Sequence, residues 1–194
     1  MDTAVLYSGG KDSSFVAVML ERLGLNPELY TANFGVYDSY IPAFKSTEAL
    51  GFKHHVLKMD SEILKTTCEM ILKDGFPNNG IKYIHEKTVE ELAENHDIIA
   101  DGTRRDDRTP KLNINQIKSL EDRFDVQYIN LDSFGHKSVK LISENLFEIS
   151  KERSNRDSSS DFEVEIRTMI DEMGANSLDI FPEHYQTRVI GYKQ

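Results

Sequence analysis

The stretch Tyr7-Ser8-Gly9-Gly10-Lys11-Asp12-Ser13 holds the residue types best suited to chemistry in this sequence. It joins an apolar run at residues 4–7, short enough for a buried strand, to residues 14–20, which are typical of a helix packed on a sheet. The first N–H groups of a helix lack partners and point outward, so a strand, a glycine-rich turn and a helix N-terminus form an anion site. The two glycines allow close backbone approach, and the serines and the lysine add donors and charge. The stretch therefore predicts phosphate binding.

The spacing differs from that of the Walker-type loop, which places four residues between its first glycine and its Gly-Lys pair. It matches the SGGxDS signature of the PP-loop, with Lys11 at the variable position, so the chain resembles the N-type ATP pyrophosphatases. Members of that superfamily include NAD synthetase, GMP synthetase and the tRNA-thiolating enzymes. They cleave ATP between its α and β phosphates and transfer AMP to a substrate oxygen. The alternative is a glycine-rich turn without a ligand, but the complete signature at the end of a strand favours phosphate binding.

The resemblance implies ATP and Mg²⁺ as cofactors. The signature residues expected to bind ATP are Ser8, Gly9, Gly10, Lys11, Asp12 and Ser13. Lys11 and Asp12 are also catalytic candidates, with Lys11 holding the departing pyrophosphate. Asp12 is a candidate Mg²⁺ ligand, because a carboxylate repels a polyphosphate unless a cation lies between them. The superfamily holds adenine at the position of Asn33 and Phe34, where Phe34 is expected either to pack on the base or to join the core.

Five short apolar runs are expected to form strands, at residues 4–7, 28–34, 53–58, 97–100 and 126–131. Helical signals follow each of them, and strands that alternate with helices predict a parallel sheet covered on both faces. The resemblance adds a strand order. It implies a five-stranded, Rossmann-like α/β sheet of the adenine nucleotide alpha hydrolase type in the order 3-2-1-4-5, so the first strand should neighbour the fourth.

The remaining segments are expected to complete one domain over residues 1–194, with a core at about residues 2–150. Asn78-Asn79-Gly80 predicts a turn. A helix after Gly135 is expected to carry Val139, Ile142, Leu146 and Ile149 on one face. The polar stretch 151–161 is expected to be a mobile loop that leads into a helix with an apolar stripe beginning at Phe162. Residues 161–194 should pack on the core. The aromatic tail is expected to form a packed strand, or alternatively to close over the site with His184, Gln186 and Arg188.

A second group of chemically suited residues follows the fourth expected strand, in Asp101-Gly102-Thr103-Arg104-Arg105-Asp106-Asp107-Arg108. Ligands of open parallel sheets bind beyond the carboxyl ends of the strands. Because the resemblance places the first strand beside the fourth, this loop is expected to face the PP-loop. The alternative is a solvated loop in which the alternating charges pair with one another, but its position after a strand favours function.

The resemblance places this loop near the ribose, the α-phosphate and the substrate to be adenylated. Gly102 and Thr103 are expected to contact ATP. Guanidinium groups match oxyanions, so the catalytic candidates in this loop are Arg104, Arg105 and Arg108. Mg²⁺ favours oxygen ligands beside phosphates, so the candidate ligands are Asp12, Asp101, Asp106 and Asp107.

Composition limits the partners. The net charge of −10 argues against unaided binding of nucleic acid, which usually requires a basic face. No apolar run is long enough to cross a membrane, and no targeting segment is expected before the first strand. The single cysteine, Cys68, excludes an internal disulfide. Cys68 lies on an apolar helical stripe, so its thiol is expected to be buried. Any sulfur or ammonia used in the reaction would come from an external donor. The expected compartment is the cytoplasm.

Together these observations predict an ATP pyrophosphatase that activates a substrate as its adenylate. The chain looks most similar to stand-alone PP-loop proteins grouped with tRNA-modifying enzymes, which makes a tRNA nucleobase an acceptor to consider. The alternatives are a small-molecule amide or amidine synthetase that uses the same adenylation step, and a nucleotide sensor without catalysis. The oligomeric state is left open.

Overall fold

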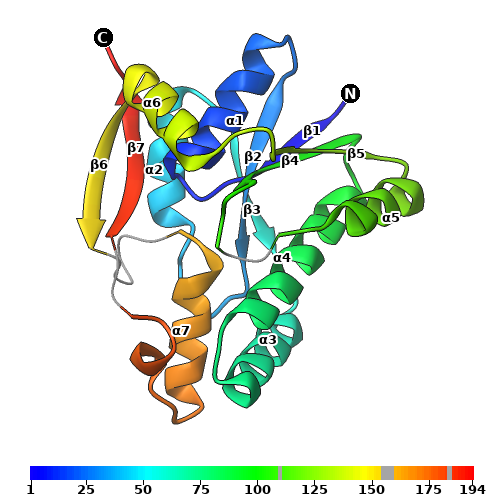
Figure 1. Cartoon of the computed structure of the whole chain (residues 1–194), viewed down its shortest axis with the longest axis vertical. Helices are drawn as coiled ribbons and strands as arrows, with labels where there is room; N and C mark the ends of the chain where they lie inside the picture. The colour runs from blue at the N-terminus through cyan, green and yellow to red at the C-terminus, as the bar shows by residue number, and fades with distance from the viewer. Residues whose placement is uncertain (109–110, 154–159, 183–184) are drawn as a thin grey trace.

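Figure 1 shows the computed structural model, which describes residues 1–108, 111–153, 160–182 and 185–194. Its centre is a five-stranded parallel sheet with the strand order β3-β2-β1-β4-β5. The strands are β1 (Thr3–Leu6), β2 (Pro27–Asn33), β3 (His54–Lys58), β4 (Ile98–Arg104) and β5 (Gln127–Leu131). The predicted α/β fold and its strand order, 3-2-1-4-5, are therefore confirmed.

Neighbouring residues of the central strand β1 pack on opposite faces of the sheet, as the period of two in a strand requires. Val5 joins the core beneath α1 (Lys11–Arg22) and α6 (His136–Leu146). Ala4 joins the core beneath α4 (Asn78–Ala93) and α5 (Ile114–Phe124). Both side chains are fully buried. Helices cover both faces, which explains why the strands read as continuous apolar runs rather than alternating ones.

The helices α3 (Ser61–Asp74), α4 and α7 (Phe162–Glu172) form a further layer beyond the end of β2 (Figure 1). The prediction of a turn at residues 78–80 was wrong, because α4 already begins at Asn78. A Cβ atom on Gly80 would lie 2.9 Å from the carbonyl oxygen of Thr67 and 2.5 Å from Cγ1 of Ile71. The glycine that resembled a turn signal instead lets α3 and α4 pack closely.

Two strands outside the main sheet, β6 (Phe147–Arg153) and β7 (Tyr185–Tyr192), pair as an antiparallel ribbon. The prediction that Ile149 continues the preceding helix was wrong. The helix α6 ends at Leu146, and Ile149 pairs with Val189 of β7. The partner strand comes from far along the chain, so local spacing could not reveal it. The predicted loop at 151–161 is shorter, since residues 151–153 belong to β6, and residues 154–159 lie outside the described part.

The β6–β7 ribbon packs beside α2 (Ile41–Leu50) and touches the PP-loop, because the Val189 N–H donates to the Gly9 carbonyl oxygen at 2.9 Å. Between α7 and the ribbon lies a short 3-10 helix, η1 (Ser177–Asp179). The expected site residue His184 lies outside the described residues. Within the described ranges, no helix has the length and apolar character needed to cross a membrane.

Candidate functional site

The PP-loop connects β1 to α1 and takes a shape that requires glycine at its tip. Gly9 has a φ of +77°, in the left-handed region that side chains disfavour. A Cβ atom there would also lie 3.2 Å from Cα of Ala43 and 3.0 Å from Oγ of Ser46. Gly10 then precedes the first helical residue, Lys11. The loop is thus pressed against α2 while the free N–H end of α1 is presented at the edge of the sheet.

The end of β4 lies directly against the PP-loop, as the neighbouring positions of β1 and β4 predict. A Cβ atom on Gly102 would lie 2.7 Å from the Ser13 nitrogen and 2.9 Å from the carbonyl carbon of Asp12. Real Cβ contacts are essentially never this short, so only glycine fits without movement. The predicted meeting of the two chemically rich segments is therefore a feature of the structure.

Oppositely charged groups link these two segments. Both Asp12 oxygens accept hydrogen bonds from Lys11 Nζ at 2.9 Å and from Arg104 Nη1 at 3.1 Å. The Arg104 guanidinium also binds Asp107, and its Nε lies 3.6 Å from Asp106. Burial opposes the charge of Arg104, but Asp12, Asp107 and Asp106 outweigh it and raise the pKa of this guanidinium. Arg104 is thus held as a cation that joins the PP-loop to β4.

Asp101 is buried and surrounded by donors. His85 Nε2 lies 2.7 Å from one carboxylate oxygen, to which the Tyr128 hydroxyl also donates. The other oxygen accepts from the Thr103 N–H at 2.8 Å and from the Thr103 hydroxyl at 2.6 Å. Burial raises the pKa of Asp101, but the charge and hydrogen bond of His85, together with the hydroxyl donors, lower it overall. With both oxygens engaged, Asp101 fixes the end of β4 and is poorly placed to bind a cation.

The other charged residues of the loop point elsewhere. Asp106 caps α6, accepting the His136 N–H at 2.8 Å and 3.0 Å on its two oxygens, and this bond lowers the pKa of Asp106. Arg105 and Arg108 are exposed. The structure therefore brings Arg104 and Asp107 to the PP-loop, but it leaves Asp106, Arg105 and Arg108 at the rim.

Asn33 and Phe34 shape the end of β2 rather than line a cavity. Asn33 donates from Nδ2 to the Tyr37 carbonyl oxygen at 2.6 Å. Phe34 is 4% exposed within the core around α3 and α7, and its N–H lies 3.1 Å from both oxygens of Glu165. Burial of Glu165 raises its pKa, although the backbone donors of the Phe34–Tyr37 segment counter this. Of the two roles expected for Phe34, the structure shows the one in the core.

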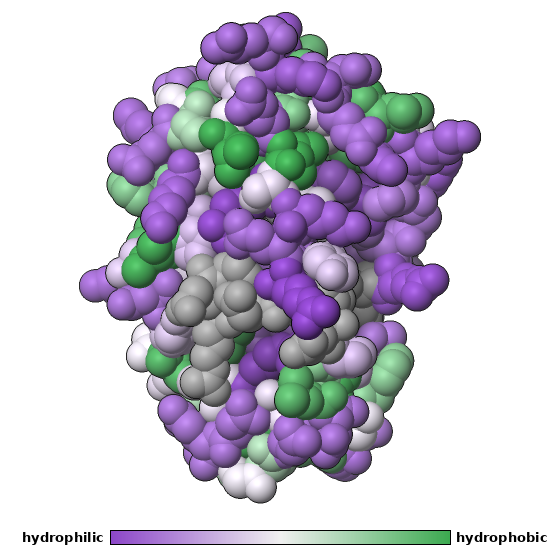
Figure 2. Space-filling view, turned by 90° about the vertical axis from the view of Figure 1, so that its left-hand side faces the viewer, coloured by the Kyte–Doolittle hydropathy of each residue, from purple (hydrophilic) through white to green (hydrophobic). Residues whose placement is uncertain are grey.

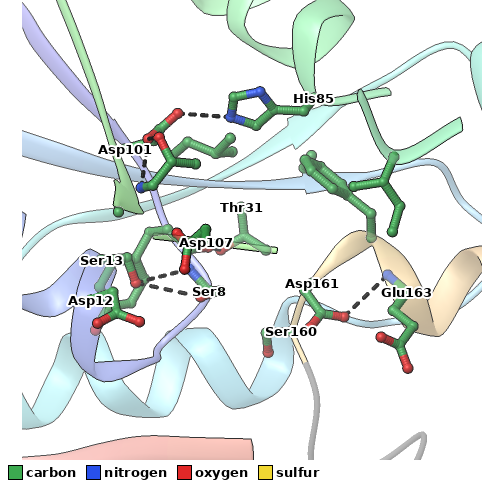
Figure 3. Close-up of a pocket in the computed structure, with 17 residues that line it drawn as sticks. Ser8, Asp12, Ser13, Thr31, His85, Asp101, Asp107, Ser160, Asp161 and Glu163 are labelled. Carbon is green, nitrogen blue, oxygen red and sulfur yellow. Dashed lines mark hydrogen bonds and ion pairs between the residues drawn. The ribbon is translucent and has the colours of Figure 1, made fainter. Parts of the chain in front are cut away.

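A cavity of about 330 Å³ lies at the carboxyl ends of the strands (Figure 3). Ser8, Asp12 and Ser13 form one side, and Asp101 with His85 lies opposite. Other predicted residues that line it are Gly102, Thr103 and Asp107.

Sequence reasoning missed the residues that close this cavity from α4, α7 and β2. They are Thr31, Ala32, Ile81, His85, Ser160, Asp161, Phe162 and Glu163. His85 follows Ile84 on the buried face of α4, and Phe162 begins the apolar stripe of α7. The stripe that begins at Phe162 was visible in the sequence, but the sequence did not show that its first residue lines this cavity.

Several carboxylate side chains are among the residues that line this cavity. Asp12, Asp101, Asp107, Asp161 and Glu163 all contribute to it. Within the described ranges, no three His, Cys, Asp or Glu side chains are grouped so as to hold a metal ion. The four aspartates predicted as Mg²⁺ ligands are thus spread over the PP-loop, the buried end of β4 and the cap of α6.

Comparisons with known proteins give the following relatives. The uncharacterized protein MJ0690 of Methanocaldococcus jannaschii is 46% identical over 195 residues, covering 100% of this chain and 98% of its own. A crystal structure from the same organism, described as a predicted subunit of tRNA methyltransferase, has a TM-score of 0.94 and 46% identity, covering 100% of this chain and 99% of its own.

A more distant structure is the U34-tRNA thiolase NcsA from Methanococcus maripaludis, solved with its 4Fe-4S cluster. It has a TM-score of 0.50 and 20% identity, covering 74% of this chain and 56% of the thiolase, a likeness that concerns the fold alone. A family model described as a family of unknown function (DUF7411) matches residues 1–191. With this match and a relative 46% identical over the full chain, the protein belongs to the DUF7411 family.

Proposed function

We propose that this protein is a PP-loop enzyme that cleaves Mg·ATP into AMP and pyrophosphate and adenylates a nucleobase of tRNA. The observation that carries the proposal is the close packing of the SGGxDS loop on Gly102, with Lys11 and Arg104 converging on Asp12. A role in tRNA modification is supported by the relative described as a predicted tRNA methyltransferase subunit and by the fold shared with a tRNA thiolase.

The PP-loop fits a polyphosphate in three respects. The left-handed turn at Gly9 and the start of α1 present backbone donors, to which Ser8 and Ser13 add hydroxyl groups. Lys11 and Arg104 supply positive charge beside the loop, and both are bound to Asp12. A magnesium ion on the Asp12 carboxylate would take over its charge and release the two cations to the phosphate oxygens. ATP and Mg²⁺ are therefore expected to bind together.

The cavity beside the loop fits the nucleoside. Its volume of about 330 Å³ lies within the usual range for small-ligand sites. Ala32, Ile81 and Phe162 provide apolar surface, while Thr31 and His85 provide polar groups near the sheet. The structure thus offers Phe162 and Ile81, rather than Phe34, as side chains to pack on adenine.

In the proposed reaction an oxygen of the substrate attacks the α-phosphorus, the bond to the bridging oxygen breaks, and pyrophosphate leaves with the electron pair. Arg104 and Lys11 would stabilise the charge that develops on the phosphates, and the rigid loop would supply orientation. Cys68 cannot carry sulfur for a later step. It is fully buried, and burial, reinforced by Glu69, raises the pKa of its thiol to about 12. The nucleophile that displaces AMP would therefore come from outside this chain.

The test follows ATP labelled at the α-phosphate with Mg²⁺, the protein and bulk tRNA from Methanocaldococcus jannaschii, before and after RNase treatment. Labelled AMP and pyrophosphate that form only with intact tRNA are the expected result. AMP that survives RNase treatment would replace tRNA with a small-molecule acceptor. ADP with free phosphate, or ATP bound without turnover, would refute the adenylation mechanism.

A further inference from the structure

A second and larger cavity, of about 1130 Å³, also borders the PP-loop and is lined by residues of α6 and the β6–β7 ribbon. It shares Ser8, Asp12, Ser160 and Asp161 with the smaller cavity, so the two spaces meet at the PP-loop. Its volume lies above the usual range for a small-molecule site. The arrangement offers two entrances to one reaction centre.

The outer wall of this cavity carries cationic side chains on a protein with a net charge of −10. Lys140 comes from α6, Lys151 from β6 and Lys193 from the segment after β7. Glu144 and Glu148 also line the wall, and Lys140 lies 3.7 Å from Glu144. Both members of that pair are about half exposed, and such surface pairs contribute little stability, so the lysine is easily released to another anion.

An aromatic side chain lies next to one of these lysines, Lys151. Tyr185 at the start of β7 is 58% exposed, and Lys151 Nζ lies 5.0 Å from the centre of its ring. A tyrosine beside a lysine provides both a surface for stacking a base and a charge for its phosphate. Figure 2 looks onto the side of the molecule that carries the ribbon and α7, where the described surface is largely hydrophilic.

We infer that this second cavity receives an unpaired nucleotide of an RNA substrate, with its base on Tyr185 and its phosphate at Lys151. The choice of RNA rests on the proposed function. RNA-binding proteins read unpaired nucleotides by stacking them on aromatic side chains. ATP would enter through the smaller cavity and the RNA through the larger one, and their reacting groups would meet at Ser8 and Asp12, which line both.

The test measures binding of fluorescently labelled bulk tRNA from Methanocaldococcus jannaschii to the full chain at several salt concentrations. The variants are Lys151→Ala and Tyr185→Ala. The control for Lys151→Ala is Lys118→Ala, which removes an exposed lysine of α5. The control for Tyr185→Ala is Phe76→Ala, which removes a side chain that is 54% exposed between α3 and α4. The salt slope is the slope of the logarithm of the binding constant against the logarithm of the salt concentration. In Lys151→Ala this slope should be smaller in magnitude by about one, as expected when one phosphate contact is lost. Tyr185→Ala should weaken binding about tenfold at an unchanged salt slope. The controls should change neither quantity.

The inference is overturned if tRNA binding is the same in both cavity variants and the wild type, if the controls lose as much as the cavity variants, or if the wild type binds no tRNA. ATP binding, measured separately by calorimetry, reports on the proposed function. A chain that binds tRNA through Lys151 and Tyr185 but neither binds nor cleaves ATP would refute the proposed function and keep the RNA site. A chain that cleaves ATP without binding tRNA would refute the RNA site and keep the ATP-cleaving activity.

Discussion

Two aspartates on either side of Gly102 use the same functional group in opposite ways. Asp101 is 2% exposed and its oxygens are engaged by His85, Tyr128 and Thr103, so it fixes the end of β4. The Asp12 side chain is 27% exposed, and its partners are cations that a metal ion can replace and that a phosphate can bind in place of the carboxylate. Burial and the type of donor thus separate a structural carboxylate from one available for chemistry.

The largest effect is expected from Asp12→Asn. The substitution removes the carboxylate that would hold Mg²⁺ and orient Lys11 and Arg104, so the rate of AMP formation should fall by about a hundredfold or more. Because Asp12 itself is partly exposed and Arg104 keeps its ion pair with Asp107, the free energy of unfolding should change by only about 1 kcal/mol. The labelled-ATP assay and urea unfolding measure the two quantities. Full activity in this variant would remove the distinction between the two aspartates.

Gly102→Ala should affect both carboxylates at once. The new Cβ would lie 2.7 Å from the Ser13 nitrogen, so β4 and the PP-loop must separate. We expect a loss of about 1–3 kcal/mol in the free energy of unfolding, as for other overpacked sites, together with weaker ATP binding by calorimetry. Gly191→Ala is the matched control, because no atom lies within 4 Å of its added Cβ. Equal effects in the two variants would contradict the proposed contact.

Asp101→Asn should reduce stability by about 2 kcal/mol, since a neutral amide replaces a carboxylate that accepts several hydrogen bonds. Among molecules that stay folded, the rate of AMP formation should change little. Urea unfolding and the labelled-ATP assay under native conditions measure the two effects. Asp122→Asn, on the exposed side of α5, is the control and should leave stability unchanged. A large loss of activity in folded Asp101→Asn protein would move this residue into the catalytic group.

The smallest expected effect is on the free energy of unfolding at low pH. The folded pKa of Asp101 lies below its ordinary value of 3.8, so the unfolded chain binds the proton more readily. The stability that this ionised group contributes is fully present above that ordinary value and is lost as the pH falls through the lower, folded pKa. The difference in unfolding free energy between wild type and Asp101→Asn should therefore shrink below about pH 4. A difference that stays constant down to pH 2 would show that ionisation of Asp101 does not stabilise the fold.

The parts of the molecule that the sequence predicts are those that depend on local signals. The strand at residues 3–6, the glycine turn after it and the apolar faces of the following helices all lie within short windows, so the sheet and the PP-loop could be recognised. The meeting of Gly102 with the PP-loop followed from the strand order that the resemblance implied. These signals require no knowledge of distant contacts.

The remaining features depend on pairs of residues far apart in the chain. Ile149 has helical spacing, yet it pairs with Val189 in the ribbon. His85 lies on an ordinary apolar stripe, and its contact with Asp101 appears only when α4 packs on β4. Phe34 could serve a base or the core, and its side chain is buried among residues of α3 and α7, which lie far from it in the sequence. In each case a tertiary contact assigns a role that the local sequence leaves open.

The hydrogen bond from the Val189 N–H to the Gly9 carbonyl oxygen also has a consequence for biosynthesis. The PP-loop is synthesised well before the strand that contacts it. Domains generally fold as units. The contact that presses on Gly9 can therefore form only once synthesis has reached β7. A product that stops before β7 would carry the full signature sequence without this contact.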